Sequence, residues 1–555
     1  MTKRRGMIGM LVLVGGLAAP VAVKAQDAVL VIRSAGELLD DVQYLAKATV
    51  SEDQAGQVMG MVQNLKQQGL QGLDLTKPIG LLGSLPKQAG EAPMIVAAIP
   101  TKDVGALLQS LQGLGLQSQP FQGEPGFTHQ VMLPDGNTSL YVTSSADYAY
   151  FSMVPSGAKE IQALTPSVWA PKRPGAGDVS LTVRLDKLPP QMKQSVIDAV
   201  AQQAAAEQDR KPGESDSEYQ GRLVGMKMAG EAVTRFLQDA GQVALDLAID
   251  QTKGEMSLAL STSAKSGTPM AKAISGFAGR RSRFSALGSR APMAGWASFP
   301  IPKEFQELMG KLVEEGRKKA LEEAENETEK KIAGEVIDAL QPTLSSDALD
   351  LGMSVQLAEG GKSVLVGGMQ VVDGKKIETA LRDALKASPP KDDTKVTLDA
   401  AKAADGTSIH KIQGKVDENT AKMFGKDAAL YLAFQDDLMM VVLGEKGEEA
   451  MKKALGSASD RPAATALPPA ALVVHAAKLA PFAQQGADTD AEREAMTKAA
   501  GEVFQGANAS KDLLRVSVQG EGDTVFLKVS CDVPVLSFFA KVGMAQQQQL
   551  AAPNQ

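Results

Sequence analysis

Apolar residues recur in one strand-then-helix pattern at two distant places in the chain. In residues 94–111, an apolar run of strand length is followed, after Asp103, by apolar residues at helical spacing. Residues 363–385 repeat this order, with Asp373 at the same point. Each aspartate favours a helix start, because its carboxylate can accept unpaired backbone N–H groups of the first turn. The pattern predicts the same strand and helix in both halves.

Further segments of the second half follow those of the first half in the same order. Strand-like residues 138–154 match 428–443, residues 180–190 match 471–481, and the hairpin at 242–263 matches 513–530. A shared order over this length indicates internal duplication. We therefore expect an α+β fold with two pseudo-symmetric halves, each a mainly antiparallel sheet packed against helices.

The pattern also predicts how the chain is divided. The expected parts are a signal peptide at 1–25, a first α+β half at 26–278, an Arg-rich junction at 279–290, a second half at 291–543 and a disordered tail at 544–555. Within the second half, residues 303–340 carry apolar side chains on one face and Glu and Lys on the others. This predicts one long amphipathic helix that braces the halves, in preference to a membrane-surface helix, which usually has a basic excess.

The N-terminal residues have the features of a secretory signal peptide. Lys3, Arg4 and Arg5 precede an apolar run, and Ala25 ends a short cleavage-type motif. We expect cleavage after Ala25 and an exported protein, periplasmic or extracellular, with no membrane span afterwards. Retention of the segment as an anchor is less favoured, because glycines and Pro20 interrupt a run that is short for a membrane span.

Length and charge narrow the possible partners. A chain of 555 residues exceeds the size of one hydrophobic core, and its 44% hydrophobic and 22% charged residues are typical of globular proteins. Signal cleavage removes four basic and no acidic residues, so the formal net charge falls from −7 to −11. Such a surface repels nucleic acid. No nucleic-acid partner is expected.

The single cysteine, Cys531, excludes an intramolecular disulfide. It lies in an apolar run, which favours a small buried core residue over intermolecular pairing or a reactive thiol.

Histidines, the usual bases and metal ligands, are scarce: His129, His410 and His475. His129 and His410 occupy similar places in the two halves, so a pair could bind a metal or sense pH. The favoured interpretation is two strand histidines that face solvent or a hydrogen-bond partner. No HExxH spacing is present, and His475 matches Arg184, which indicates a surface position. No metal and no cofactor is predicted.

Motifs of nucleophilic and phosphate chemistry are also lacking. There is no G-x-S-x-G, and the S-x-x-K matches occur at a number that chance produces. The GGKS at residues 360–363 precedes a strand, where a phosphate-binding loop needs a helix, and so predicts a hairpin turn. No catalytic residue is predicted.

One basic cluster stands out in this acidic chain. It comprises Arg280, Arg281, Arg283 and Arg290. We predict a patch for an anionic partner or envelope polymer. The alternative is that these arginines form ion pairs with the Glu-rich helix.

Four segments resemble a group of exported, uncharacterised proteins typical of planctomycete bacteria. They are IPTKDVGALLQSL at 99–111, DYAYFSM at 147–153, VSLTVRLDKLPPQMKQSVID at 179–198 and SRFSAL at 282–287. The resemblance covers most of the first half and the junction, and it weakens through the second half. It implies a cell-envelope or secreted location and a two-part α+β build. It carries no catalytic residue over to this chain.

These observations favour a non-enzymatic exported binding or structural module of the cell envelope, whose partner is an unknown envelope protein, a polymer or an apolar ligand. The alternative is a carrier of an apolar small molecule or lipid, held between sheet and helices. A hydrolase with residues scattered through the fold is less favoured.

Overall fold

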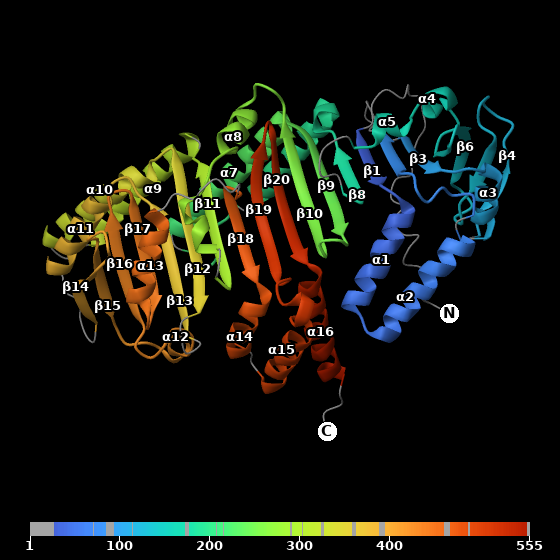
Figure 1. Cartoon of the computed structure of the whole chain (residues 1–555). Coiled ribbons are helices and arrows are strands. Elements are labelled where there is room, and N and C mark those ends of the chain that lie inside the picture. The colour runs from blue at the N-terminus through green and yellow to red at the C-terminus, as the bar shows by residue number, and fades with distance from the viewer. Residues whose placement is uncertain are drawn as a thin grey trace. The chain divides into compact units, whose positions relative to one another are not determined.

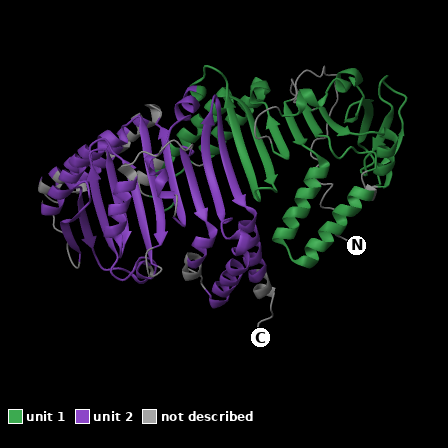
Figure 2. Ribbon diagram, viewed as in Figure 1, with its two compact units in different colours: residues 1–271 green, residues 272–555 purple. Residues whose placement is uncertain are grey.

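The computed structural model describes residues 27–551, except for residues 70, 85–93, 114, 172–176, 207, 215, 289–290, 302, 324–326, 358–361, 388–393, 460–466 and 487–488. The chain folds as two compact units, unit 1 (Met1–Ala271) and unit 2 (Lys272–Gln555), coloured separately in Figure 2. Each unit combines an antiparallel sheet with helices, which confirms the α+β class predicted from the sequence.

The described strands of unit 1 form one sheet in the order β4-β5-β6-β7-β3-β2-β1-β8-β9-β10, with every neighbouring pair antiparallel (Figure 1). Their bounds are β1 (Ala28–Ile32), β2 (Ile79–Ser84), β3 (Met94–Pro100), β4 (Gln117–Pro120), β5 (His129–Met132), β6 (Ser139–Ser145), β7 (Tyr148–Ser152), β8 (Val179–Val183), β9 (Ala240–Asp250) and β10 (Glu255–Ala264).

The helices of unit 1 lie in the connections between these strands. They are α1 (Ala35–Thr49), α2 (Glu52–Asn64) with a π-helical end (Leu65–Gly69), α3 (Val104–Gly113), α4 (Ala158–Gln162), α5 (Pro166–Trp169), a 3₁₀ turn (Leu185–Lys187), α6 (Pro190–Ala206), α7 (Asp216–Asp239) and α8 (Pro269–Phe277), which contains the boundary with unit 2. Ser34 caps α1, and Ser51 with Gln54 forms a capping box at the start of α2.

Both faces of the unit 1 sheet are covered around β3. Val96 and Ala98 point to the face where α4, α5 and Trp169 pack. Ala97 and Ile99 point to the opposite face, where Leu107 and Leu108 of α3 fill the core. A strand that is covered on both sides reads as a continuous apolar run, as β3 does.

The described strands of unit 2 have the order β14-β15-β16-β17-β13-β12-β11-β18-β19-β20, again antiparallel throughout. This is the order of unit 1 with every strand number raised by ten. The bounds are β11 (Met293–Pro300), β12 (Ala348–Leu357), β13 (Ser363–Gln370), β14 (Lys395–Lys402), β15 (Ser408–Gln413), β16 (Ala429–Gln435), β17 (Leu438–Gly444), β18 (Ala470–His475), β19 (Leu513–Glu521) and β20 (Thr524–Asp532).

Helices cover both faces of this sheet at β16 and β17. Tyr431 and Met440 pack in the core with α13, whereas Phe434 and Val441 pack in the core with α10 and α11. The helices are α9 (Lys303–Glu323), α10 (Glu327–Leu344), α11 (Gly374–Ala387), α12 (Glu418–Phe424), α13 (Gly447–Ser459), α14 (Ala476–Gly486), α15 (Asp490–Val503) and α16 (Val533–Ala551), with 3₁₀ turns at Arg283–Gly288 and Gly506–Asn508.

The two predicted helix-start aspartates act as expected. Asp103 Oδ1 accepts the backbone N–H groups of Gly105 (2.8 Å) and Ala106 (3.1 Å) at the start of α3. Asp373 Oδ1 accepts the backbone N–H of Lys376 (2.9 Å) at the start of α11. The strand and helix that each aspartate joins are present in both units.

Some predictions differ from the structure. The single helix expected at 303–340 is two helices, α9 and α10, which pack on each other, with Arg317 Nη1 3.1 Å from Asp338 Oδ1. The tail expected to be disordered from Met544 is helical to Ala551. Strands β2 and β4 had no predicted counterpart. Within the described residues, no helix has the length and apolar character that crossing a membrane requires.

Candidate functional site

The predicted pair His129 and His410 occupies one register position in two separate units. His129 pairs with Val142 on β6, and His410 pairs with Leu432 on the corresponding strand β16. Their surroundings differ. His129 is half-buried, with its Nδ1 3.0 Å from Thr128 Oγ1, whereas His410 is fully buried. Each ring therefore finds a hydrogen-bond partner in its own unit, and only His410 belongs to a buried cluster.

His410 lies in a cluster of charged groups from three elements. Its Nδ1 accepts the backbone N–H of Asp399 (3.1 Å), and its Nε2 is 3.2 Å from Glu378 Oε1 on α11. Asp399 interrupts the register of β14 against β15 and has a positive φ of 55°. Because Nδ1 is an acceptor, the neutral ring carries its hydrogen on Nε2 and donates it to Glu378.

Two cations of α11 balance the carboxylates of this cluster. Arg382 donates to Asp399 through both Nη atoms (2.9 and 2.6 Å) and to Glu378 Oε1 through Nε (3.0 Å) and Nη2 (2.7 Å). Lys375 Nζ donates to Glu378 Oε2 (3.1 Å) and to the carbonyl of Phe434 (2.9 Å). Positions 375, 378 and 382 lie on one helix face, so α11 supplies three of the charges from adjacent turns.

The pKa values of the cluster follow from these contacts. Burial lowers the pKa of His410, and the nearby Arg382 charge lowers it further. Burial raises the pKa of Glu378, but hydrogen bonds from Arg382 and Lys375 outweigh it, so the net direction is down. The hydrogen bond from Arg382 holds the pKa of Asp399 well below its usual range. The cluster is thus a neutral histidine among compensated ions.

The geometry does not suit a metal ion, although Glu378, Asp399 and His410 bring ligand atoms within 4.8 Å of one another. Arg382 Nη2 donates to Glu378 and to Asp399, so a guanidinium already lies between the two carboxylates. A cation there would displace Arg382 or sit against its charge. We interpret the cluster as a structural ion network that fixes α11 to β14 and β15.

Unit 1 has no such network at the corresponding position. Counting from the helix-start aspartates, Glu378 and Arg382 correspond to Leu108 and Gln112 of α3. Leu108 is buried in an apolar core with Val131 and Phe151. The polar cluster therefore distinguishes unit 2 from unit 1.

The predicted arginine patch is only partly a free surface. Arg283 Nη1 donates to the side chain (2.9 Å) and carbonyl (3.2 Å) of Asp437, in the turn between β16 and β17. Arg280 Nε donates to the Gly276 carbonyl (3.0 Å), and Arg281 is exposed. Arg290 lies outside the described residues. Arg283 therefore forms an ion pair with this turn, and anion binding by the patch stays a prediction.

The two remaining single residues have local roles. His475 is half-buried with its Nδ1 2.9 Å from Asp512 Oδ1, so it is hydrogen-bonded and not a freely exposed surface residue. Cys531 is buried in β20, which confirms the core position predicted for it.

A polar depression in unit 1 collects several carboxylates in a volume of about 550 Å³. Asp41 is buried there, burial raises its pKa, and Gln251 donates to it at 2.8 Å. Asp178 accepts from Arg33 (2.5 Å) and from the backbone of Ile249 (2.7 Å). Both buried carboxylates are engaged with protein donors, which is the arrangement of a structural network.

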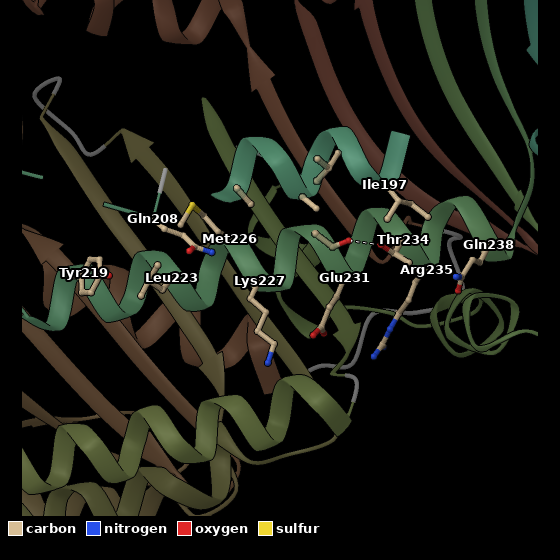
Figure 3. Close-up of a pocket in the computed structure, with 14 residues that line it drawn as sticks. Ile197, Gln208, Tyr219, Leu223, Met226, Lys227, Glu231, Thr234, Arg235 and Gln238 are labelled. Atoms are coloured by element: carbon tan, nitrogen blue, oxygen red, sulfur yellow. Dashed lines mark hydrogen bonds between the residues drawn. The ribbon is translucent and has the colours of Figure 1, made fainter. Parts of the chain in front are cut away.

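An apolar groove of about 810 Å³ lies between α6 and α7, as Figure 3 shows. Its walls are Ile197, Val200 and Ala204 from α6, and Leu223 and Met226 from α7. The charged lining residues all belong to α7: Lys227, Glu231 and Arg235. An apolar floor with a few polar groups at its edge is the usual composition of a binding site.

Two glycines of α7 have open space at the position of a side chain, one inside the groove and one outside it. A Cβ atom at Gly225 or at Gly230 would meet nothing within 4 Å, and only Gly230 lines the groove. Helical periodicity in the sequence does not indicate the groove, because an apolar stripe on a helix has the same pattern whether or not another element covers it.

Comparison with known proteins adds no relative: no protein-family model, no curated protein and no solved structure matches the chain.

Proposed function

We propose that the chain is a non-enzymatic, exported binding module of the cell envelope, and that the groove between α6 and α7 is its binding site. The observation that carries the proposal is the groove itself, about 810 Å³ of space with apolar walls on two neighbouring helices. Exposed apolar surface of this kind is a typical feature of interaction sites.

The state of the polar clusters supports a non-enzymatic role. A catalytic acid or base must be open to the substrate, so that it can come within hydrogen-bond distance of the proton that it transfers. In the described residues, His410 has protein partners on both ring nitrogens, and Glu378 receives hydrogen bonds from two cations. A hydrolase remains the least favoured function, with Asp41 in the polar depression as its best acid.

Export is proposed from the N-terminal sequence pattern: three basic residues, an apolar run and Ala25. In this proposal the mature chain works in the periplasm or outside the cell.

We also infer that units 1 and 2 arose by internal duplication. Their sheets have the same strand order, and His129 and His410 hold the same register position. The aspartates at the starts of α3 and α11 follow corresponding strands. In this interpretation the core was retained in both units, while the groove and the ion network each belong to one of them.

A second candidate function is the carriage of an apolar small molecule or lipid. The groove volume of about 810 Å³ favours it, because ligand pockets usually measure about 300–1,000 Å³. The site would then lie between two helices and not between sheet and helices, as the sequence suggested.

The proposal is tested with an apolar fluorescent dye, anilinonaphthalene sulfonate, titrated into the full mature chain. Gly230→Leu places a side chain in the groove, whereas Gly225→Leu adds the same side chain on the same helix outside it. We expect saturable dye binding that Gly230→Leu weakens about tenfold and Gly225→Leu leaves unchanged, since about 1.4 kcal/mol is one decade in affinity. Equal binding by all three proteins would contradict the groove as the site.

A further inference from the structure

The sheet of unit 1 has one face that is apolar and open to solvent across β1, β8, β9 and β10. Leu30, Leu181, Leu245 and Leu260 stand opposite one another in register, one on each strand. Leu181, Leu245 and Leu260 are 38%, 40% and 41% exposed. No helix lies in front of β9 and β10 in Figure 1. The side chains that share this face are all Leu, Ile or Val and none is buried; we call them the leucine face: Leu30, Ile32, Val179, Leu181, Val183, Val243, Leu245, Leu247, Leu258 and Leu260.

The opposite face of the same strands is buried, although its residues are small or polar. Ser180 pairs with Asp246, and Ala244 pairs with Ser261, and all four are buried. Ser180 Oγ donates to Asp246 Oδ1 at 2.5 Å. An antiparallel sheet with one solvated face usually has its large apolar residues on the buried side and its polar residues on the solvated side. The arrangement here is the reverse, which is typical of a face that another molecule covers.

Unit 2 has an open apolar face on the equivalent part of its sheet. Met353 of β12 and Leu472 of β18 both pair with Gly295 of β11, and they are 47% and 43% exposed. Leu351 and Leu527, in the neighbouring row, are 38% and 39% exposed. Strands β11, β18, β19 and β20 have the places in the sheet order that β1, β8, β9 and β10 have in unit 1. Each unit therefore presents one such face.

The size of the two faces fits a dimer. Four strands spaced by about 4.8 Å, with three rows of side chains spaced by about 6.8 Å, span about 400 Å². If one such face is covered by another, about 800 Å² is buried in total, which is the upper limit of crystal-packing contacts. If the faces of both units are covered, the total is about 1,600 Å², which is the standard size of a stable interface.

Charge and symmetry favour a second copy of this chain as the partner. The chain has a formal net charge of −7, so two copies repel each other unless they meet where no charged side chain is present. The leucine face is such a surface. A partner must also bring two apolar sheet faces, and a second copy has both. Two sheets pack face to face about 10 Å apart when apolar side chains of one fit between those of the other.

We propose that the chain forms a homodimer in which the leucine face of unit 1 and the open apolar face of unit 2 are each covered by a second copy. The contact is apolar, and the symmetry of a dimer supplies the same surfaces from both partners. This interface is separate from the groove between α6 and α7, and the proposal does not depend on the function assigned to that groove.

The test is sedimentation velocity of the full mature chain at concentrations from about 0.1 to 100 µM. We expect a dimer. Leu245→Lys in unit 1 or Leu472→Lys in unit 2 is expected to weaken it at least about a hundredfold, because each places an unpaired charge in an apolar contact. The matched control is Met61→Lys, which makes the same change of charge at a 60% exposed apolar residue of α2, outside both faces. It should leave the dimer unchanged.

Two results would overturn the proposal: a wild-type chain that is monomeric over the whole range, or a dimer that the two leucine variants weaken no more than Met61→Lys does. Native mass spectrometry of the same samples adds a third. A monomer that carries a lipid, which Leu245→Lys releases, would show that the occupant is a lipid and not a second copy.

A milder variant keeps the test valid if lysine prevents folding, which circular dichroism would reveal. Leu245→Ser removes the apolar side chain without adding a charge, and it is expected to weaken the dimer about tenfold. A dimer unchanged by a folded Leu245→Ser would also contradict the proposal. Dye binding in the groove should be the same for Leu245→Ser and the wild type, so failure of the dimer and failure of the groove are separate results.

Discussion

At His410 the two ring nitrogens have different partners, and this difference determines what the residue contributes. One nitrogen accepts a backbone N–H and the other faces a carboxylate, so the neutral ring satisfies two buried groups at once. The histidine acts as a polar link between β14 and α11, beside the apolar core to which Phe434 belongs.

Removal of this link is expected to destabilise unit 2. His410→Ala removes the acceptor of the Asp399 N–H and one of the donors to the Glu378 carboxylate, and it creates a cavity, at a cost of about 2–4 kcal/mol. His129→Ala, at the same register position in unit 1, is the matched control and is expected to cost under about 1 kcal/mol, because His129 is half-exposed.

Urea unfolding can follow each unit separately, because the two tryptophans of the chain, Trp169 and Trp296, lie in units 1 and 2. Trp169→Phe leaves Trp296 as the reporter for His410→Ala, and Trp296→Phe leaves Trp169 for His129→Ala. Equal losses for the two alanine variants would contradict a special role of His410.

The stability of unit 2 is expected to fall as the pH drops below the ordinary histidine value of 6.5. Burial lowers the pKa of His410 in the folded state, so the unfolded chain takes up a proton first, and acidification favours unfolding. Glu378 adds a second loss at lower pH: its folded pKa lies below its ordinary 4.5, so its stabilisation is lost as the pH falls through that folded value.

The measurement is urea unfolding of the Trp169→Phe chain between pH 7.5 and 5.5, with and without His410→Gln. His410→Gln should flatten the part of the pH slope that starts near 6.5. An unchanged slope would assign the effect to another group.

On the scale of elements, the sequence predicts a helix or strand best where the local capping residues and the pattern of buried apolar residues indicate the same element. The strand and helix around Asp103 and Asp373 were found because a continuous apolar run, a capping carboxylate and a helical period occur together. Strand β2 was missed because Gly80 and Gly83 read as breakers. In the structure Gly80 lies directly under the Trp169 ring, where a Cβ would stand about 3 Å from the ring atoms.

The break between α9 and α10 and the ion network were missed for related reasons. The residues between Glu323 and Glu327 include no glycine or proline, so the helical spacing of apolar residues continues across them and the sequence predicts one helix. Glu378 and Arg382 look like an ordinary surface pair at i and i+4 beside the apolar residues of α11. Only the fold brings Asp399 and His410 against them.

At the level of a single element, the position of α11 against the β16–β17 turn depends on Gly374. Its backbone N–H donates to the carbonyl of Asp436 (2.8 Å), and a Cβ at this position would overlap the carbonyl oxygen of Gln435. Gly374→Ala is expected to destabilise unit 2 by about 1–3 kcal/mol through displacement of α11 from the β16–β17 turn.

The matched control for Gly374→Ala is Gly456→Ala in α13, where a Cβ would meet nothing within 4 Å. This change is expected to stabilise the unit by up to about 1 kcal/mol, because alanine favours a helix more than glycine does. Thermal unfolding followed by Trp296 emission reports both effects. Opposite signs are expected, and a loss in both variants would show that the overlap is not the cause.

For the whole molecule, the sequence predicts the repeated core and says little about function. Positions that are similar in the two units, such as the apolar residues of β3 and β13, are those that fill a core. The features that differ, the groove of unit 1 and the ion network of unit 2, depend on which faces are left open or polar. Whether a face is left open or polar in the fold produces no periodic pattern of apolar residues in the sequence, so the sequence does not predict it.

The most direct test of the account is site-specific photocrosslinking in the cells that produce the protein. A benzophenone side chain is placed at Val200, which lines the groove, or at the exposed Gln202 of the same helix, which does not. The account predicts a specific adduct with a binding partner at Val200, with no such adduct at Gln202. Crosslinking that is absent at Val200, or the same at both positions, would contradict it.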